Sequence, residues 1–496
     1  MVSVPVGSVH LLQQASQSTT IALPMDHHFA WKPFLSSVAT IAIPVALQNL
    51  LTTTGSMVDT VMLASLGEET IGAVGLCAQF SSLMFSCYWG FVGGGMLFFS
   101  QYWGARDEKG ITSSYGITLT FMMNVAAIFA TLATRFPSFA ISIYTDKPAI
   151  QEIGITYLRI VGYAYPLQVL VMAMSALLRS IEQVRIPLYG GIASVLTNFL
   201  ANYLLIFGIG PFPRLGVRGA AIGTVIASLV NLLVVGFLAR KRAIPFVFSF
   251  REHFHWRGRI LRTYLQKCFP ILCNELFIGI GNMCVTMVLG RQTEQAIAAL
   301  AVFRTLEGVI IAFFSGFSNA ATVLVGKKVG EGEHEVAYQR AIRLVYLVSG
   351  FTAMVCLVLV TLRSPLLHAM GLSGTSYRYG SGMLCIFSVI AILRMGNWAQ
   401  NDTFRSAGDP AFGSIMEIAF MYLMVLPTIY VAGILHHIPF LVLFPLCYVD
   451  EPIRYVIMQR HLYKGSWIKP VSVIGKQQLK RFQEIHHLGE VSRKPL

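Results

Sequence analysis

Long apolar runs recur along nearly the whole chain and constrain its fold more than any other feature of the sequence. A run of about 20 apolar residues is long enough to cross the hydrocarbon core of a bilayer as an α-helix. Such runs lie at residues 36–64, 71–102, 112–134, 154–178, 187–209, 217–239, 265–290, 297–326, 339–361, 380–404, 412–434 and 439–459. Only 12% of the residues are charged, whereas soluble domains average about 25%. The sequence therefore predicts an all-α polytopic membrane protein with twelve transmembrane helices.

The distribution of basic residues predicts the orientation of these helices. An even number of spans puts both ends of the chain on one side of the membrane. Most of the 37 Lys and Arg residues then fall in the tails and in the loops of that same side, and cytoplasmic loops are enriched in these residues. We therefore expect both termini in the cytoplasm of a cell whose plasma membrane (cell inner membrane) the protein spans. This bias explains the net charge of +14 without a nucleic-acid partner.

An internal repeat divides the chain into two halves. One constant shift in residue number places Pro44 on Pro270 and, later, Arg179 on Arg405. Each half holds six predicted spans, so both enter the membrane from the same side and form a parallel repeat, with a central site expected where the two lobes meet.

The repeat sets the predicted domain boundaries. They are a flexible N-terminal leader at 1–35, an N-lobe at 36–239, a linker at 240–264, a C-lobe at 265–460 and a basic cytoplasmic tail at 461–496. The linker mixes basic residues with Phe and Trp, so we expect it to bind anionic lipid headgroups.

The eight cysteines all fall inside the predicted spans and form no CxxC pair. Neither a disulfide framework nor a metal site is therefore expected, and the thiols are interpreted as small packing groups.

Asp59 is the most informative polar residue inside a span. It lies in NLLTTTGSMVDTVMLASLG with no basic residue within ten positions, and a carboxylate at mid-bilayer costs on the order of 3 kcal/mol. Helical spacing puts Gln48, Thr52 and Asp59 on one face with Pro44 and Gly55, and the Pro and Gly make this helix bendable. A carboxylate withdrawn from water can exchange a proton when a cation or water reaches it. The alternative is a packing residue that is hydrogen-bonded to a neighbouring Thr or Asn.

Other polar residues in the spans are candidates for two roles. Besides Asp59, the candidates for proton or cation coupling are Glu275 and Glu417. The candidates for the substrate cavity are Gln48, Asn49, Thr52, Gln79, Asn198, Asn202, Arg304, Glu307, Arg394, Asn397 and Asn401. Arg304 and Glu307, three residues apart, are equally explained by an internal ion pair. Glu417 could neutralise Arg394, and Glu275 is equally explained as an interfacial residue near the cytoplasmic end of its helix.

Several segments resemble the multidrug and toxic compound extrusion (MATE) transporters. They include PVALQNLLTTTGSMVDTVMLASLG and SQYWGARD in the first half and FRSAGDPAFGSIMEIAFMYLMVLP in the second, and the resemblance covers residues 36–460. It implies two six-helix lobes that export amphipathic organic cations in exchange for protons or sodium ions. We therefore expect a monomeric transporter with a small-molecule substrate, no enzymatic activity and no cofactor beyond the coupling ion.

The chain departs from this family at two candidate positions. Asn202 stands where several relatives carry an aspartate, so Asp59 is the only strong titrating candidate of the N-lobe. Asn198 and Asn202 could bind substrate or simply join helices. Arg394 stands near an aspartate of relatives with a sodium-type site, which weakens the transfer of that site and favours an anionic or zwitterionic substrate.

Two other functions compete with drug export. A lipid-linked oligosaccharide flippase of the same superfamily would share the lobes and the repeat, but it would usually carry more basic residues inside the N-lobe. A membrane-embedded transferase would need clustered acids of the DDxxD kind or a His–carboxylate pair, and the sequence has neither.

Overall fold

The computed structural model describes residues 30–249, 253, 254, 256 and 258–486. Most of the predicted leader, residues 1–29, lies outside the described residues. The chain divides into a unit that ends at Ser37 and a unit of Val38–Leu496. Helix α2 (Trp31–Ala64) begins in the first unit, and everything described below belongs to the second.

Helices account for all regular structure in the described part of the chain, as the apolar runs predict. The N-terminal half contains α2, α3 (Glu68–Gly104), α4 (Glu108–Arg135), α5 (Pro137–Ser142), α6 (Pro148–Val161), α7 (Ala164–Ser180), α8 (Arg185–Phe207), α9 (Val217–Lys241) and the turn η1 (Pro245–Val247). The C-terminal half contains α11 (Gly258–Leu289), α12 (Glu294–Glu331), α13 (His334–Thr361), α14 (Arg363–Ala369), α15 (Gly374–Ser406), α16 (Pro410–Phe420), η2 (Met421–Val425), α17 (Leu426–Tyr430), η3 (Val431–Leu435), α18 (Phe440–Leu446), α19 (Glu451–Lys464) and α20 (Val473–Ile485).

Among the described residues, ten helices are long and apolar enough to cross a membrane, and α6 with α7, bent by 50°, makes an eleventh. The segment predicted as the twelfth span, 439–459, is divided between α18 and α19. Neither helix is long enough to cross a membrane alone, and Asp450, Glu451 and Arg454 lie at the start of α19. The prediction of a twelve-helix polytopic protein is thus confirmed in outline, with the last span broken at its charges.

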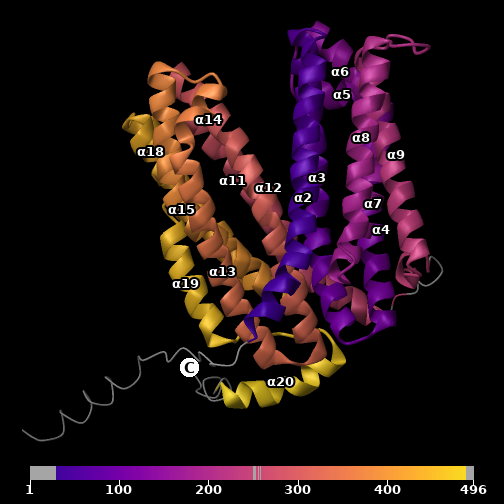
Figure 1. Cartoon of the computed structure of the whole chain (residues 1–496), viewed down its shortest axis with the longest axis vertical. Helices are drawn as coiled ribbons and strands as arrows, with labels where there is room; N and C mark the ends of the chain where they lie inside the picture. Colours follow the sequence, from indigo (N-terminus) through magenta and orange to yellow (C-terminus); the bar gives the residue numbers. More distant parts are fainter. Residues whose placement is uncertain (1–29, 250–252, 255, 257, 487–496) are drawn as a thin grey trace, which may run out of the picture. The chain divides into compact units, whose positions relative to one another are not determined.

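The helices gather in two lobes, α3–α9 and α11–α19 (Figure 1). Within the N-lobe α3 packs on α4, α6 and α7, and α8 packs on α9. Within the C-lobe α12 and α13 pack on α15, and α11 packs on α16. The lobes meet because α3 crosses both α11 and α12.

The crossing of α3 and α12 repeats itself around an approximate two-fold axis. A Cβ added to Gly104 would collide with the carbonyl oxygen of Lys327, and one added to Gly330 would collide with that of Gln101. The shift that relates the two halves takes Gly104 to Gly330 and Gln101 to Lys327. The two approaches are therefore the same contact made twice, as expected for parallel repeats.

The linker and the tail both pack onto the lobes. Phe246 and Val247 are buried in the N-lobe core, and Phe246 packs edge-to-face on Trp103 of α3. Arg240 and Lys241 remain exposed, so lipid contact by the basic part of the linker stays a prediction. In the tail, Trp467 and Ser472 are buried and α20 packs on α12 and α13, so the described part of this segment is folded.

Candidate functional site

Asp59 is held by two asparagine amides of α8. Its Oδ1 accepts a hydrogen bond of 2.8 Å from Asn202 Nδ2. When the Asn198 amide is turned to satisfy its neighbours, its nitrogen lies 2.6 Å from the same oxygen. No Lys, Arg or His of the described residues pairs with Asp59. The spacing of Asn198 and Asn202 by one helical turn brings both amides to one carboxylate.

The face of α2 predicted from spacing lies against α7 and α8. Gln48 accepts a hydrogen bond of 2.9 Å from Arg179 of α7, and Gly55 lies against Val195 of α8. Thr52, on the same face, is exposed and donates to the carbonyl of its own helix at Gln48. Gln79 of α3 is exposed and lies outside the central cavity described below.

Helix α2 also contacts the C-lobe. Asn49 Nδ2 donates a hydrogen bond of 2.5 Å to Ser315 Oγ of α12. A Cβ on Gly316 would collide with the backbone of α2 at Ala42. The helix that carries Asp59 thus touches both lobes, and a bend between Pro44 and Gly55 would move those contacts relative to each other.

A cavity of about 360 Å³ lies where the two lobes meet. Its charged lining consists of Arg179 from the N-lobe and Glu275, Asp402, Arg405 and Glu417 from the C-lobe. Three carboxylates face two guanidinium groups, which leaves one negative charge in excess when all are ionised. Trp and Ile side chains complete the wall, so the cavity combines apolar surface with opposed charges.

The two cavity arginines are repeat mates with different partners. Arg179 and Arg405 occupy matching positions of the two halves. Arg179 donates to the neutral amide oxygen of Gln48. Arg405 lies 3.3 Å from a carboxylate oxygen of Glu275 and 3.9 Å from one of Asp402. Glu275 is therefore ion-paired inside the cavity.

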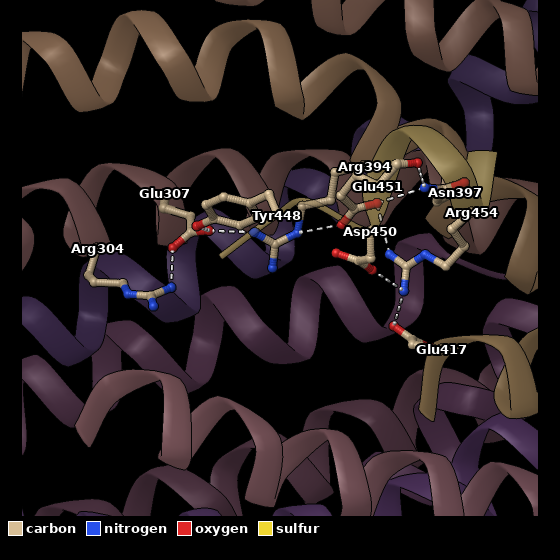
Figure 2. Close-up of polar contacts among 9 residues, drawn as sticks. All are labelled: Arg304, Glu307, Arg394, Asn397, Glu417, Tyr448, Asp450, Glu451 and Arg454. Carbon is tan, nitrogen blue, oxygen red and sulfur yellow. Dashed lines mark hydrogen bonds and ion pairs between the residues drawn. The ribbon is translucent and has the colours of Figure 1, made fainter. Parts of the chain in front are cut away.

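A chain of charges runs from the exposed Arg304 into the interior of the C-lobe (Figure 2). Arg304 Nη1 lies 2.7 Å from Glu307 Oε2, which confirms the ion pair that the spacing predicts. The other oxygen of Glu307 accepts from Arg394 Nη1 at 2.8 Å. The Arg394 guanidinium also lies 5.1 Å from the ring centre of Tyr448, close enough for a cation–π contact.

The chain continues from α15 through α19 to the cavity. Arg394 Nε lies 3.8 Å from Glu451, and Glu451 accepts from Arg454 at 2.8 Å. Arg454 in turn lies 3.7 Å from Glu417, which lines the cavity, and 3.5 Å from Asp450. With Arg304 and Glu307, three guanidinium groups thus face four carboxylates. Because Glu417 belongs to both sets, the cavity and the chain together hold five guanidinium groups and six carboxylates, one negative charge in excess.

Amides fill the remaining positions of this network. Asn397 donates to a carboxylate oxygen of Glu451 at 2.6 Å. Asn401 and Asn274 donate to Glu417 at 3.1 and 2.9 Å. The face of α15 that carries Arg394, Asn397 and Asn401 is therefore the polar face of the C-lobe.

The suggested pairing of Arg394 with Glu417 is wrong. Arg394 is neutralised by Glu307 and Glu451, because α12 and α19 pack against its side of α15. Glu417 faces Arg454 instead.

Sequence reasoning missed Asp450, Glu451 and Arg454. The signal was present, because the three charges stand in the predicted span 439–459, and charged residues inside spans tend to face the bundle interior in pairs. It also missed Arg179 and Arg405 as cavity residues, although the repeat had already superposed them.

A family model described as MatE matches the chain twice, at residues 44–204 and 270–431. The two matches begin at the positions that the internal repeat superposes. Together they cover most of both lobes.

Individual relatives and structures agree with this match. "Uncharacterized transporter YisQ" of Bacillus subtilis (strain 168) is 24% identical over 92% of this chain and 99% of its own length. "Probable multidrug resistance protein YoeA" of the same organism is 23% identical over 84% of this chain and 90% of its own. A solved structure of the Vibrio cholerae MATE transporter VcmN superposes with a TM-score of 0.80 at 16% identity, covering 92% of this chain and 99% of that one.

Proposed function

The chain belongs to the MatE family, and on that premise we propose that it is a secondary active antiporter. In this proposal it exports amphipathic organic compounds, mainly cations, in exchange for protons or sodium ions, and it requires no cofactor besides the coupling ion. It acts as a monomer in the plasma membrane with both termini in the cytoplasm, and the basic part of the linker 240–264 contacts anionic lipids.

The observation that carries the proposal is the environment of Asp59. Its carboxylate is held by the amides of Asn198 and Asn202. A proton or sodium ion can neutralise such a carboxylate without breaking an ion pair. A structural acid of a membrane protein is usually paired with a cation, as Glu307 is here.

The position of Asp59 supports its coupling to the movement of the lobes. It stands on the helix that contacts α8 through Asp59 and α12 through Asn49. Neutralising Asp59 weakens its hydrogen bonds to α8, because a charged acceptor makes the stronger bond. Ion binding would then favour the bent form of α2, and substrate binding the other, as reciprocal linkage requires.

The central cavity supports a charged, partly apolar substrate. Its carboxylates Glu275, Asp402 and Glu417 exceed its two arginines by one charge, and Trp89 and Trp398 offer aromatic surface. Aromatic faces attract organic cations, so cationic amphipathic compounds fit this lining best.

An anionic or zwitterionic substrate is the second candidate. Arg179 and Arg405 face the same cavity, one from each lobe. A substrate that carries a carboxylate or a phosphate could bind between them, with its cationic part at Glu417.

The test uses purified protein in proteoliposomes with a fluorescent organic cation. A pH gradient and a sodium gradient are imposed separately on wild type, on Asp59→Asn and on Asp146→Asn, the last an exposed loop acid that serves as the matched control. We expect one gradient to drive dye movement in wild type and in Asp146→Asn, and the Asp59→Asn substitution to abolish it.

Two results would overturn parts of this proposal. If Asp59→Asn moves dye as fast as wild type, Asp59 is a packing residue and coupling must lie at Glu275 or Glu417. If wild type moves no cation under either gradient but moves an anionic dye or a fluorescent lipid-linked sugar, the substrate is of that class, and the second candidate or a flippase replaces the first.

A further inference from the structure

Three lysines from separate segments of the chain line one cavity at the end of the C-lobe where the tail packs. Lys267 comes from α11, Lys469 from the connection between α19 and α20, and Lys476 from α20. The cavity has a volume of about 360 Å³ and is open on one side. We call it the lysine basin; its polar lining is Thr263, Lys267, Ser466, Lys469, Lys476 and Gln483.

The basin keeps a positive charge after its internal pairs are counted. Lys469 Nζ lies 2.9 Å from Asp409, which also faces His461 at 3.3 Å. Burial raises the pKa of Asp409, but its hydrogen bonds to His461 and Lys469 outweigh that effect, so the pKa lies below its ordinary value. Asp409 is therefore ionised and cancels one charge. Among the described residues Lys267 donates to the backbone carbonyl of Gly408, at 2.6 Å, and to no carboxylate, so two of the three lysine charges remain.

The surroundings of the basin are apolar and exposed. On the basin wall itself, the apolar side chains of Ile468 and Leu479 lie beside the lysines. At the start of α20, Val473 and Ile474 are 69% and 43% exposed. Exposed apolar residues beside lysines are typical of a surface at the boundary between acyl chains and headgroups. These apolar side chains would make no favourable contact with a soluble anion, whereas the acyl chains of a lipid would cover them.

We propose that the lysine basin binds the phosphate group of an anionic membrane lipid. The phosphodiester would lie between Lys267 and Lys476, with the hydroxyl of Ser466 as a further donor, and the acyl chains would cover the exposed apolar residues at the start of α20. The lipid would join α11 to α20, two segments far apart in the sequence.

The site adjoins a contact between the two lobes. The backbone N–H of Val471, which also lines the basin, donates to Gln101 Oε1 of α3 at 2.7 Å. Gln101 Nε2 donates in turn to the carbonyl of Ser406 in α15 at 2.7 Å. A lipid that holds the segment 469–476 in place would therefore stabilise the meeting point of α3, α15 and the tail.

The experiment measures lipid retention by native mass spectrometry of the full chain in detergent. Wild type is compared with Lys476→Gln, which changes an exposed residue of the basin, and with Arg481→Gln, which removes an exposed charge of α20 outside it. Each protein is titrated with phosphatidylglycerol, with phosphatidylcholine and with inorganic phosphate alone. Thermal unfolding without lipid checks that the variants are folded.

We expect wild type to retain phosphatidylglycerol over phosphatidylcholine. Lys476→Gln should lower its affinity for phosphatidylglycerol about fivefold, the effect of one lysine near an anionic lipid surface, and Arg481→Gln should leave it unchanged. Equal retention of phosphatidylglycerol by all three proteins would overturn the proposal. Binding of inorganic phosphate alone that Lys476→Gln abolishes would support the phosphate site but assign it to a soluble anion.

Discussion

The two lobes hold their buried charge in opposite ways, although the repeat relates them helix by helix. In the N-lobe a single carboxylate, Asp59, is held by two amides. The repeat places Asp59 on Val285, so the C-lobe has no acid at the matching place. Instead it carries three arginines and four acids in one connected chain (Figure 2). The repeat thus preserves the crossing of the helices and leaves the chemistry of each lobe free to differ.

This difference assigns different energetic roles to the two sets of charges. Removing one partner of a buried ion pair leaves the other partner charged and unpaired, which is costly. Changing the charge of a carboxylate held by amides leaves no such partner. We therefore expect C-lobe substitutions to act mainly on stability and Asp59 substitutions mainly on transport.

Arg454→Met should have the largest effect on stability. Arg454 is 5% exposed and contacts Glu451 at 2.8 Å and Glu417 at 3.7 Å. Its loss should cost about 3–5 kcal/mol in the free energy of unfolding, measured by thermal unfolding in detergent. The control is Arg304→Met, whose side chain is 41% exposed and has one acidic partner; we expect less than about 1 kcal/mol there. Equal losses in both variants would mean that the buried chain is not a connected unit.

Gly104→Val and Gly330→Val test the crossing of α3 and α12, where the two lobes make the same contact. Each residue lies against a backbone carbonyl of the other lobe, and forcing bulk into a tight contact typically costs about 1–3 kcal/mol. Since the two contacts are repeat mates, the shifts in melting temperature should be similar. Gly308→Val on α12, where a Cβ meets no neighbour, is the control. A shift in only one of the two glycine variants would show that the crossing is not shared symmetrically.

Arg405→Gln and Arg179→Gln test the central cavity, where two residues at matching positions of the repeat have different partners. Each substitution removes one positive charge from the cavity. At about 10 Å and an effective dielectric constant of 20, one charge acts on a bound cation by roughly 1.7 kcal/mol, so we expect KM for a cationic dye to fall about twentyfold in both. Stability should fall only in Arg405→Gln, which leaves Glu275 and Asp402 without their cation.

The opposite result would revise the substrate. If KM for the cationic dye is unchanged and transport of an anionic dye is lost in both variants, the two arginines bind the substrate directly. The second candidate function would then be favoured over the first.

The sequence predicted the scaffold better than the site, for a physical reason. Span length and the repeat are properties of local segments, so the family and the two lobes were predicted correctly. The partner of Arg394 depends on which helices pack beside α15, and no spacing within one helix reveals that α12 and α19 supply Glu307 and Glu451. Asp59 could be singled out because its isolation is itself visible in the sequence.

The broken twelfth span is a second case in which the sequence alone did not reveal the local structure. Apolar content over 439–459 predicted a continuous helix, but Asp450 and Glu451 stand where α18 has ended and α19 begins. Asp450 and Glu451, which pair with Arg454 and Arg394 in the interior of the lobe, lie at this interruption. A charged cluster inside a predicted span should therefore be interpreted as a break as well as a site.

Asn202→Ala should have a small effect on stability, and it tests most directly whether Asp59 or the C-lobe chain of charges couples transport to the ion. Asn202 is 2% exposed and donates to Asp59 at 2.8 Å, but hydrogen bonds between helices in membrane proteins average only about 0.6 kcal/mol. We expect a correspondingly small change in the melting temperature. If Asp59 is the coupling group, the same substitution should alter the dependence of dye transport on the driving ion, because it removes a donor that stabilises the ionised form. Asn397→Ala, which removes an amide donor from Glu451 in the C-lobe, is the control and should leave that dependence unchanged. The reverse pattern, with coupling altered only by Asn397→Ala, would move the coupling site from Asp59 to the charged chain of the C-lobe.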